Sequence, residues 1–173
     1  MKIKRNIALW IRKLHRWGAI AVFLPFSIVL LSGILLQLKK EIAWVQPPTT
    51  QGVGKSPRLP LDQLLAVAQM IPDAEIKGWE DIDRIDVRPD YGIAKVQCKN
   101  HWEIQIDWFT GKINHAAYRR SDVIESLHVG SWFHPNARLW VFLPSAFIVL
   151  GLLCTGLYLL FHRIKLINLK SKI

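Results

Sequence analysis

The sequence predicts a membrane α-helical protein in which two transmembrane helices flank a small extracytoplasmic α+β domain. This prediction rests on two apolar blocks and on the mixed, polar segment that separates them. Residues 17–38 and residues 139–161 contain no Asp, Glu, Lys or Arg. At about 1.5 Å per residue, each block is long enough to cross a hydrocarbon core of roughly 30 Å.

The first apolar block also resembles a signal peptide, because it follows a basic N-terminus. It is longer than the apolar core of a signal peptide, and it contains Pro25 near its middle. It then continues into Lys39, Lys40 and Glu41 without the small residues of a cleavage site. We therefore expect the block to remain as a membrane anchor.

Charge predicts the orientation of both helices. Residues 1–16 and 162–173 together carry ten Lys and Arg residues and no acidic residue, which accounts for the whole formal charge of +10. Basic residues beside a span resist translocation, so we expect a bacterial inner-membrane protein with both termini in the cytoplasm. Because the excess charge lies at two membrane edges, it indicates contact with the lipid bilayer and argues against nucleic-acid binding.

Composition and periodicity divide the chain into seven segments. In order, they are a basic N-terminus (1–16), the first transmembrane helix (17–38), a linker (39–60), the α+β domain (61–120), an amphipathic interfacial segment (121–137), the second transmembrane helix (138–161) and a basic C-terminus (162–173). Within the domain, spacing predicts a helix over 61–70 and antiparallel strands over 84–88, 92–99, 102–108 and 113–118. Such a sheet has an open edge, which either accepts a strand of another protein or is blunted by Lys and Asp.

Neither the cysteines nor any catalytic motif assigns chemistry to the chain. Cys98 and Cys154 belong to different segments and form no CxxC motif, so they predict neither an intramolecular disulfide nor a metal site. A bridge between the Cys98 residues of two chains stays open. No nucleophile elbow, zinc-protease, P-loop or dinucleotide motif occurs, so no self-contained catalytic activity is predicted.

Three stretches of the sequence carry recognisable motifs. Residues 14–18 (Leu-His-Arg-Trp-Gly) run into residues 31–33 (Leu-Ser-Gly), residues 106–113 read Ile-Asp-Trp-Phe-Thr-Gly-Lys-Ile, and residues 127–130 (Leu-His-Val-Gly) precede Thr155 and Gly156. In combination, these stretches resemble the PepSY-associated transmembrane proteins over most of the chain. The resemblance implies a PepSY domain between the helices. Larger members of the family have four or more spans, and some resemble ferric or siderophore-iron reductases that hold b-type haem.

The resemblance raises a haem hypothesis that one pair of histidines supports. His15 precedes the first span by two residues and His162 directly follows the second, so antiparallel helices bring both residues to one membrane face. Two facing neutral imidazoles would ligate the iron of haem b, with Gly18, Ala19 and Ala21 leaving room for the ring. The alternative is that both histidines are interfacial residues at helix ends.

His128 and His134 are the second candidate pair, and they lie near the opposite membrane face. His128 cannot share a haem with His15, so a second haem would need His134, or His128 of a second chain. We expect a homodimer or a larger membrane complex, because two chains form a four-helix bundle whose core holds a cofactor. The alternative is that His128 packs the interfacial segment against the membrane surface.

Two functions follow from these observations. The first is an accessory membrane protein that serves as a b-haem electron-transfer subunit in iron or siderophore reduction, or in respiration. The second is a non-catalytic PepSY module that binds or inhibits a periplasmic partner protein. The two differ in whether haem is bound, and in whether it is lost when His15 or His162 is replaced.

Overall fold

The computed structural model describes residues 2–170, apart from the side chains of residues 2–5, 166 and 168–170, and divides the chain into two compact units. The helical unit consists of Met1–Gly33 and Ser126–Ile173, and the sheet unit is Ile34–Glu125. The predicted end segments, 1–16 and 162–173, therefore fall partly outside the described residues. The two units are described separately below.

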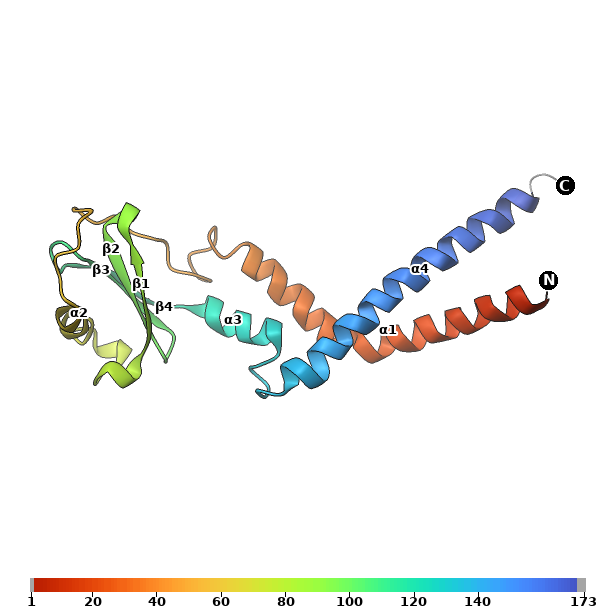
Figure 1. The fold of residues 1–173 in the computed structure, drawn as a ribbon, viewed down its shortest axis with the longest axis horizontal. Coiled ribbons are helices and arrows are strands. Elements are labelled where there is room, and N and C mark those ends of the chain that lie inside the picture. Colours follow the sequence, from red (N-terminus) through yellow and green to blue (C-terminus); the bar gives the residue numbers. More distant parts are fainter. Residues whose placement is uncertain (1, 171–173) are drawn as a thin grey trace. The chain divides into compact units, whose positions relative to one another are not determined.

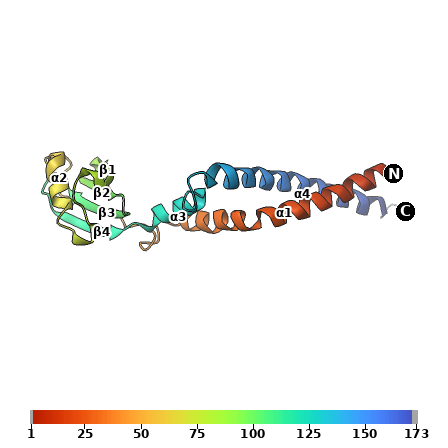
Figure 2. The ribbon, with the colours of Figure 1, turned by 90° about the horizontal axis from the view of Figure 1, so that it is seen from below.

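Two long antiparallel helices form the helical unit. Helix α1 spans Lys2–Gln37, and α4 spans Leu143–Lys170 after a π-helical turn, η4, at Arg138–Phe142. The start of α1 and the end of α4 lie at the same end of the pair, and the two helices cross in both views (Figures 1 and 2). Helix α1 begins earlier than the predicted span, because Lys, Arg and Leu at residues 2–16 are all good helix formers.

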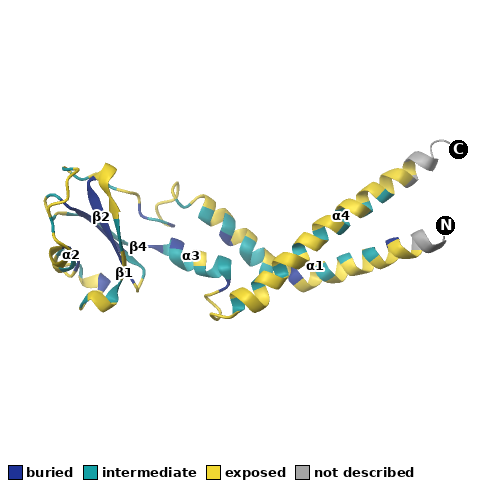
Figure 3. Ribbon diagram, viewed as in Figure 1, coloured by how far each residue is buried: buried dark blue, intermediate teal, exposed yellow. Residues whose placement is uncertain are grey.

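Both helices are apolar and long enough to cross a membrane, over Asn6–Gln37 and Arg138–Lys165. They are not the core helices of a soluble domain, because most of their apolar side chains are exposed (Figure 3). They meet at Gly18, where an added Cβ would lie 3.2 Å from Leu152 Cδ2. Pro25 lies inside α1 and removes one intrahelical hydrogen bond beside an apolar hollow of about 170 Å³ between the helices.

The sheet unit contains one helix and four antiparallel strands. Helix α2 (Leu61–Ala68) precedes β1 (Ile82–Arg88), β2 (Ile93–Cys98), β3 (Trp102–Asp107) and β4 (Ile113–Tyr118). The strands pair in chain order, β1-β2-β3-β4. Short 3-10 turns follow α2 and join the first strands, and α3 (Arg120–Val129) begins directly after β4. The predicted helix followed by an antiparallel sheet is confirmed.

One face of the sheet carries the hydrophobic core. Alternate residues of β2 and β3 point towards α2, and with Leu64 and Ala68 they form a buried cluster that includes Ala94, Val96, Cys98, Ile104 and Ile106. Burial, with a smaller effect of the charge on Asp81, raises the pKa of the Cys98 thiol to about 11. A thiol that is both buried and protonated argues against the bridge between Cys98 residues that the sequence left open.

The other face of the sheet is polar, yet it is buried as well. Lys95, Gln97, Glu103, Gln105 and Asp107 are all less than 6% exposed. Residues 45–54, which we call the strap, lie across this face and belong to the predicted linker. The strap has no regular structure, as predicted, but hydrogen bonds from side chains of the sheet hold it in place.

Side chains of the sheet form hydrogen bonds mainly to the backbone of the strap. Gln105 accepts a hydrogen bond from the Thr50 amide through Oε1 and donates one to the Pro48 carbonyl through Nε2, both at 2.8 Å. Asp107 Oδ2 accepts from the Val53 amide at 2.8 Å, and the indole of Trp108 donates to the Gly54 carbonyl at 2.9 Å. These bonds satisfy backbone groups that the irregular strap cannot satisfy itself.

Glu103 is the centre of a buried charge network on the polar face. Its carboxylate lies 3.1 Å from Lys95 Nζ and 3.4 Å from Arg119 Nη1. Lys95 also donates to Thr49 Oγ1 of the strap, and Arg119 Nε lies 3.0 Å from Asp122 Oδ1 at the start of α3. The network therefore ties both chain connections of the sheet unit, the one from α1 and the one to α3, to the same face of the sheet.

The Glu103 network predicts a large loss of stability for the Glu103→Ala variant. The substitution leaves Lys95 as a buried cation without a carboxylate and leaves Arg119 with Asp122 alone, so we expect the unfolding free energy of the sheet unit to fall by about 3–5 kcal/mol. Urea unfolding of the full chain in detergent, followed by tryptophan fluorescence, measures the change. Asp83→Ala is the control, because it removes an exposed pair and should cost less than about 1 kcal/mol. Equal midpoints for the two variants would contradict the prediction.

Asp107 predicts a dependence of the strap on pH. Burial acts to raise the pKa of this carboxyl, but hydrogen bonds from the amides of Val53, Phe109 and Thr110 outweigh it, and the net pKa is lowered. The stabilisation is therefore complete above the unfolded pKa of about 4 and is lost as the pH falls through the lower folded value. In Asp107→Asn we expect weaker amide exchange protection at Val53 at pH 7, by about 1–3 kcal/mol, and less further loss in acid. Identical pH profiles for the variant and the wild type would refute this.

Candidate histidine sites

Two of the four predicted histidines are held inside the helical unit by hydroxyl groups. His15 on α1 and His128 on α3 are both half-buried. Each makes a hydrogen bond to a Ser or Thr that is followed by Gly in a long helix. We call these the His15 site (His15, Thr155, Gly156) and the His128 site (His128, Ser32, Gly33).

At the His15 site, α1 places the imidazole against α4. His15 Nδ1 lies 2.8 Å from Thr155 Oγ1. The same hydroxyl donates its hydrogen to the helix carbonyls of Gly151 and Leu152, at 2.9 and 3.1 Å. The next residue is Gly156, where an added Cβ would lie 3.6 Å from His15 Cε1. The glycine thus lets the ring lie against the backbone of α4.

The His128 site repeats this arrangement with the helices exchanged. His128 Nδ1 lies 3.0 Å from Ser32 Oγ on α1, and that hydroxyl donates to the Ile28 carbonyl at 2.6 Å and to the Val29 carbonyl at 3.2 Å. A Cβ on Gly33 would lie 3.3 Å from His128 Cε1. Any larger residue at position 33 would therefore push the imidazole away from α1.

The hydroxyl geometry assigns the tautomer of both histidines. A hydroxyl has one hydrogen, and here the helix carbonyls accept it, so the hydroxyl oxygen accepts a second bond from Nδ1–H of the histidine. Nδ1 then carries a hydrogen, and in the neutral form of such a ring the lone pair lies on Nε2. A second hydrogen bond that fixes the ring in this way is the usual partner of a metal-ligating histidine. No hydrogen bond to either Nε2 occurs among the described residues.

The two sites lie at different depths of the helical unit. His15 and Ser32 both belong to α1 and are seventeen residues apart, which is about 25 Å along a helix. Within the described residues, no group of three or more His, Cys, Asp and Glu side chains could hold a metal ion. Among the described residues, each site contains one imidazole.

The other two predicted histidines are not brought to these sites. His162 stacks on Tyr158 one turn earlier in α4, with ring centroids 6.0 Å apart. It follows Thr155 by seven residues, or about 10 Å along α4, so it does not face His15 in the structure. His134 is exposed, and its Nδ1 accepts a hydrogen bond from the Asn136 amide.

The sequence did not reveal the role of the hydroxyl and glycine pairs. Residues 32–33 (Ser-Gly) and 155–156 (Thr-Gly) are typical of close helix packing, which needs no histidine. The sequence contained one indication of that role. Counted along the predicted helices, residues 32–33 lie at about the level of His128, and residues 155–156 lie at about the level of His15. Depth alone, however, does not say which face of a helix a side chain occupies.

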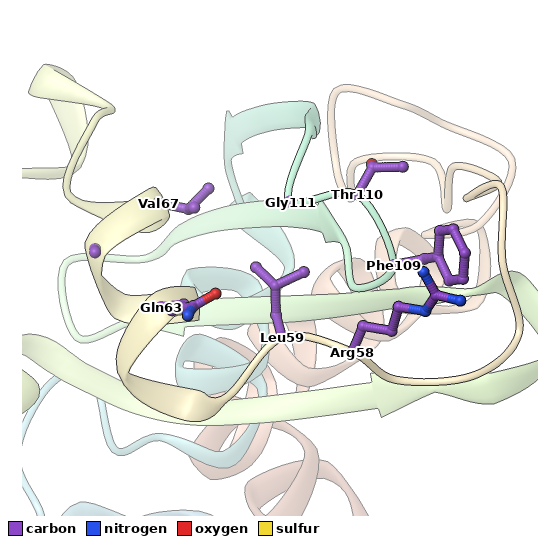
Figure 4. Close-up of a pocket in the computed structure, with 8 residues that line it drawn as sticks. Arg58, Leu59, Gln63, Val67, Phe109, Thr110 and Gly111 are labelled. Carbon is purple, nitrogen blue, oxygen red and sulfur yellow. The ribbon is translucent and has the colours of Figure 1, made fainter.

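The sheet unit has a separate surface hollow that the sequence did not predict. It has a volume of about 500 Å³ and lies between the start of α2 and the turn after β3 (Figure 4). The guanidinium of Arg58 lies 3.9 Å from the centroid of the Phe109 ring, with Thr110 and Gln63 nearby. Apolar walls beside one cation could accept an apolar side chain next to a carboxylate.

Comparison with protein families decides the kind of protein this is. The family described as the PepSY-associated TM region matches residues 12–172, which is nearly the whole chain. The chain belongs to this family. The predicted resemblance to the PepSY-associated transmembrane proteins is thus confirmed, and with the two apolar helices it indicates a membrane protein. Comparison with curated proteins and with solved structures gave no significant match.

Proposed function

We propose that this PepSY-associated TM protein is a membrane electron-transfer subunit in which His15 and His128 would each help to hold a b-type haem. The carrying observation is the matched pair of histidine sites, in which a hydroxyl holds Nδ1–H and leaves Nε2 free. Haem supplies one-electron redox chemistry at a potential that the protein tunes through its ligands. The chain itself holds, orients and insulates those ligands.

The residues at both sites fit such a group. The ligand atom offered is the nitrogen of a neutral imidazole, which haem iron binds. Gly33 and Gly156 give each ring space against a helix, and the helices around both sites are apolar. Because each site contains one histidine among the described residues, a histidine of another subunit would complete the set of residues that holds the group.

Orientation and pathway complete the proposal. The basic tails support an inner-membrane protein with both termini in the cytoplasm, which puts the His15 site near the cytoplasmic face and the His128 site near the other. Two redox sites about 25 Å apart along α1 suit electron transfer across a bilayer. The family resemblance favours iron or siderophore reduction, or respiration, as the process in which the protein takes part.

The absorption spectrum of the purified protein tests this function. In protein expressed with added haem, we expect a Soret band that shifts on dithionite reduction and a sharp α band. His15→Ala and His128→Ala should each remove about half of the bound haem, whereas His115→Ala, in the sheet unit, should remove none. A wild-type spectrum without the Soret and α bands would refute the proposal. Loss of haem in His162→Ala but not in His128→Ala would restore the axial pair predicted from the sequence.

Removal of the hydroxyls gives a finer test. In Thr155→Val and Ser32→Ala, the histidine loses the acceptor that fixes its Nδ1–H, so we expect haem affinity to fall about 10–100-fold. The reduction potential of the remaining haem should rise, because the imidazole donates less electron density. Ser27→Ala is the matched control, since the Ser27 hydroxyl bonds only to the Phe23 carbonyl of its own helix. Equal affinities in Ser27→Ala and Thr155→Val would show that the hydroxyls do not support a ligand.

A second candidate function is favoured by the surface hollow of the sheet unit. A non-catalytic PepSY module would use Arg58, Phe109 and Thr110 to hold a segment of a periplasmic partner protein. Such a module would keep its partner after replacement of His15 and His128, and it would lose the partner in Arg58→Ala. A protein without haem would make this the leading function.

A further inference from the structure

The two edges of the sheet differ sharply in charge. The β1 edge carries Asp83, Arg84, Asp86 and Arg88, with Arg88 bonded to Asp86 at 2.6 Å. By contrast, β4 reads Ile-Asn-His-Ala-Ala-Tyr and contains no Asp, Glu, Lys, Arg or Pro. Charged side chains and proline are the usual means of preventing a strand from pairing with another chain. The β1 edge is therefore blunted, and the β4 edge is not.

The outer edge of β4 has no partner among the described residues. Strand β4 pairs with β3 alone, in regular register over residues 115–118. The Asn114 side chain of β4 donates to the Gln51 carbonyl of the strap at 3.2 Å, a bond that leaves the backbone of the strand unused. The outward N–H and C=O groups of the strand are thus available to continue the sheet.

The segments that cover the two faces of the sheet limit which strand can extend it at β4. Helix α2 covers one face, whereas the strap and residues 119–122 contact the polar face. Ser121 at the start of α3 even donates its amide to the Val45 carbonyl of the strap at 2.8 Å. Both connections from the sheet unit to the long helices therefore leave from the polar face.

We propose that β4 pairs antiparallel with β4 of a second copy of this chain, which joins two sheet units into one eight-stranded sheet. The twofold axis of such a pair is perpendicular to the sheet, so both copies present their polar faces on the same side. All four connections to the membrane helices then leave on that side, as two chains anchored in one bilayer require. A strand from an unrelated protein would not have to leave its connections on that side.

Self-pairing also suits the side chains of β4. Antiparallel pairing about Ala116 places this residue opposite its own copy and Ala117 opposite His115, with no like charges opposed. The same pairing at β1, about Asp86, would oppose Asp86 to its own copy and Arg84 to Arg88, which are like charges. The proposal goes beyond haem binding, although a second copy would also supply the second imidazole that each histidine site lacks.

Site-directed cross-linking provides the first arm of the test. In full-length protein in nanodiscs, with Cys154→Ser to remove the exposed thiol, Ala116→Cys and Ala117→Cys should give dimers with a short bismaleimide. Cys98 is buried in the core and serves as the unreactive background. Val87→Cys on the β1 edge is the matched control and should stay monomeric. Cross-linking only at Val87, or at no position, would overturn the proposal.

Charge placed on the edge provides the second arm. Ala116→Lys and the double variant His115→Lys/Ala117→Lys each oppose lysines across the twofold, so we expect the dimer dissociation constant in detergent to rise at least about tenfold. Val87→Lys on β1 should leave it unchanged. Hydrogen exchange of the wild-type protein tests the pairing without any variant. The backbone amides of β4 should be protected at high protein concentration and should exchange faster on dilution. Concentration-independent exchange, or unchanged dissociation constants in both β4 variants, would overturn the pairing.

Failure of this proposal and failure of the proposed function would look different. Haem in the wild type with no effect of β4 substitutions would leave the histidine sites standing and remove the β4 pairing. A β4-dependent dimer without a haem spectrum would do the reverse. Pure protein that is monomeric, but whose β4 cysteines cross-link to another membrane protein, would replace the second copy with a partner strand and overturn the proposal.

Discussion

The buried carboxylate of Glu103 is the constraint on which the sheet unit depends. A charge that is fully removed from water is tolerated only where opposite charges and hydrogen bonds replace its hydration. Lys95, Arg119 and the amide of Gln105 supply these partners. Because Lys95 also holds the strap and Arg119 also contacts α3, the requirement to pair one carboxylate fixes where the chain enters and leaves the sheet unit.

Local periodicity was sufficient to predict the elements of the sheet unit but not their burial. Alternation in residues 102–108 placed Ile104 and Ile106 on the core face, and the structure agrees. The same alternation makes Glu103, Gln105 and Asp107 look solvent-exposed, yet they are buried under the strap. The strap could not be found from pattern, because its Pro and Gly residues indicate only irregular backbone. The bonds that hold it join residues about fifty positions apart, and no local signal encodes such bonds.

The same limit applies to the histidine sites. Counting residues from the ends of the apolar blocks predicted that His15 and His162 lie at one membrane face, but such counting does not say which side chain each ring contacts. Helix α1 starts at Lys2, so His15 is an interior helix residue, with its ring directed at Thr155. Which residue it faces depends on the crossing of two helices, which follows from packing around Gly18 rather than from hydropathy.

The histidine sites also differ from ordinary histidines at the ends of membrane helices. An interfacial histidine leaves both nitrogens to water and headgroups, and it needs no particular neighbour. At both sites here, one nitrogen is held by a hydroxyl whose own hydrogen is already used by the helix, and a glycine keeps the ring against the backbone. The hydroxyl and the glycine together restrict the motion of each ring, and they direct Nε2 away from the helix that the ring contacts. The arrangement appears twice, with the helices exchanged, so at each site one hydroxyl and one glycine of a long helix determine how the histidine lies.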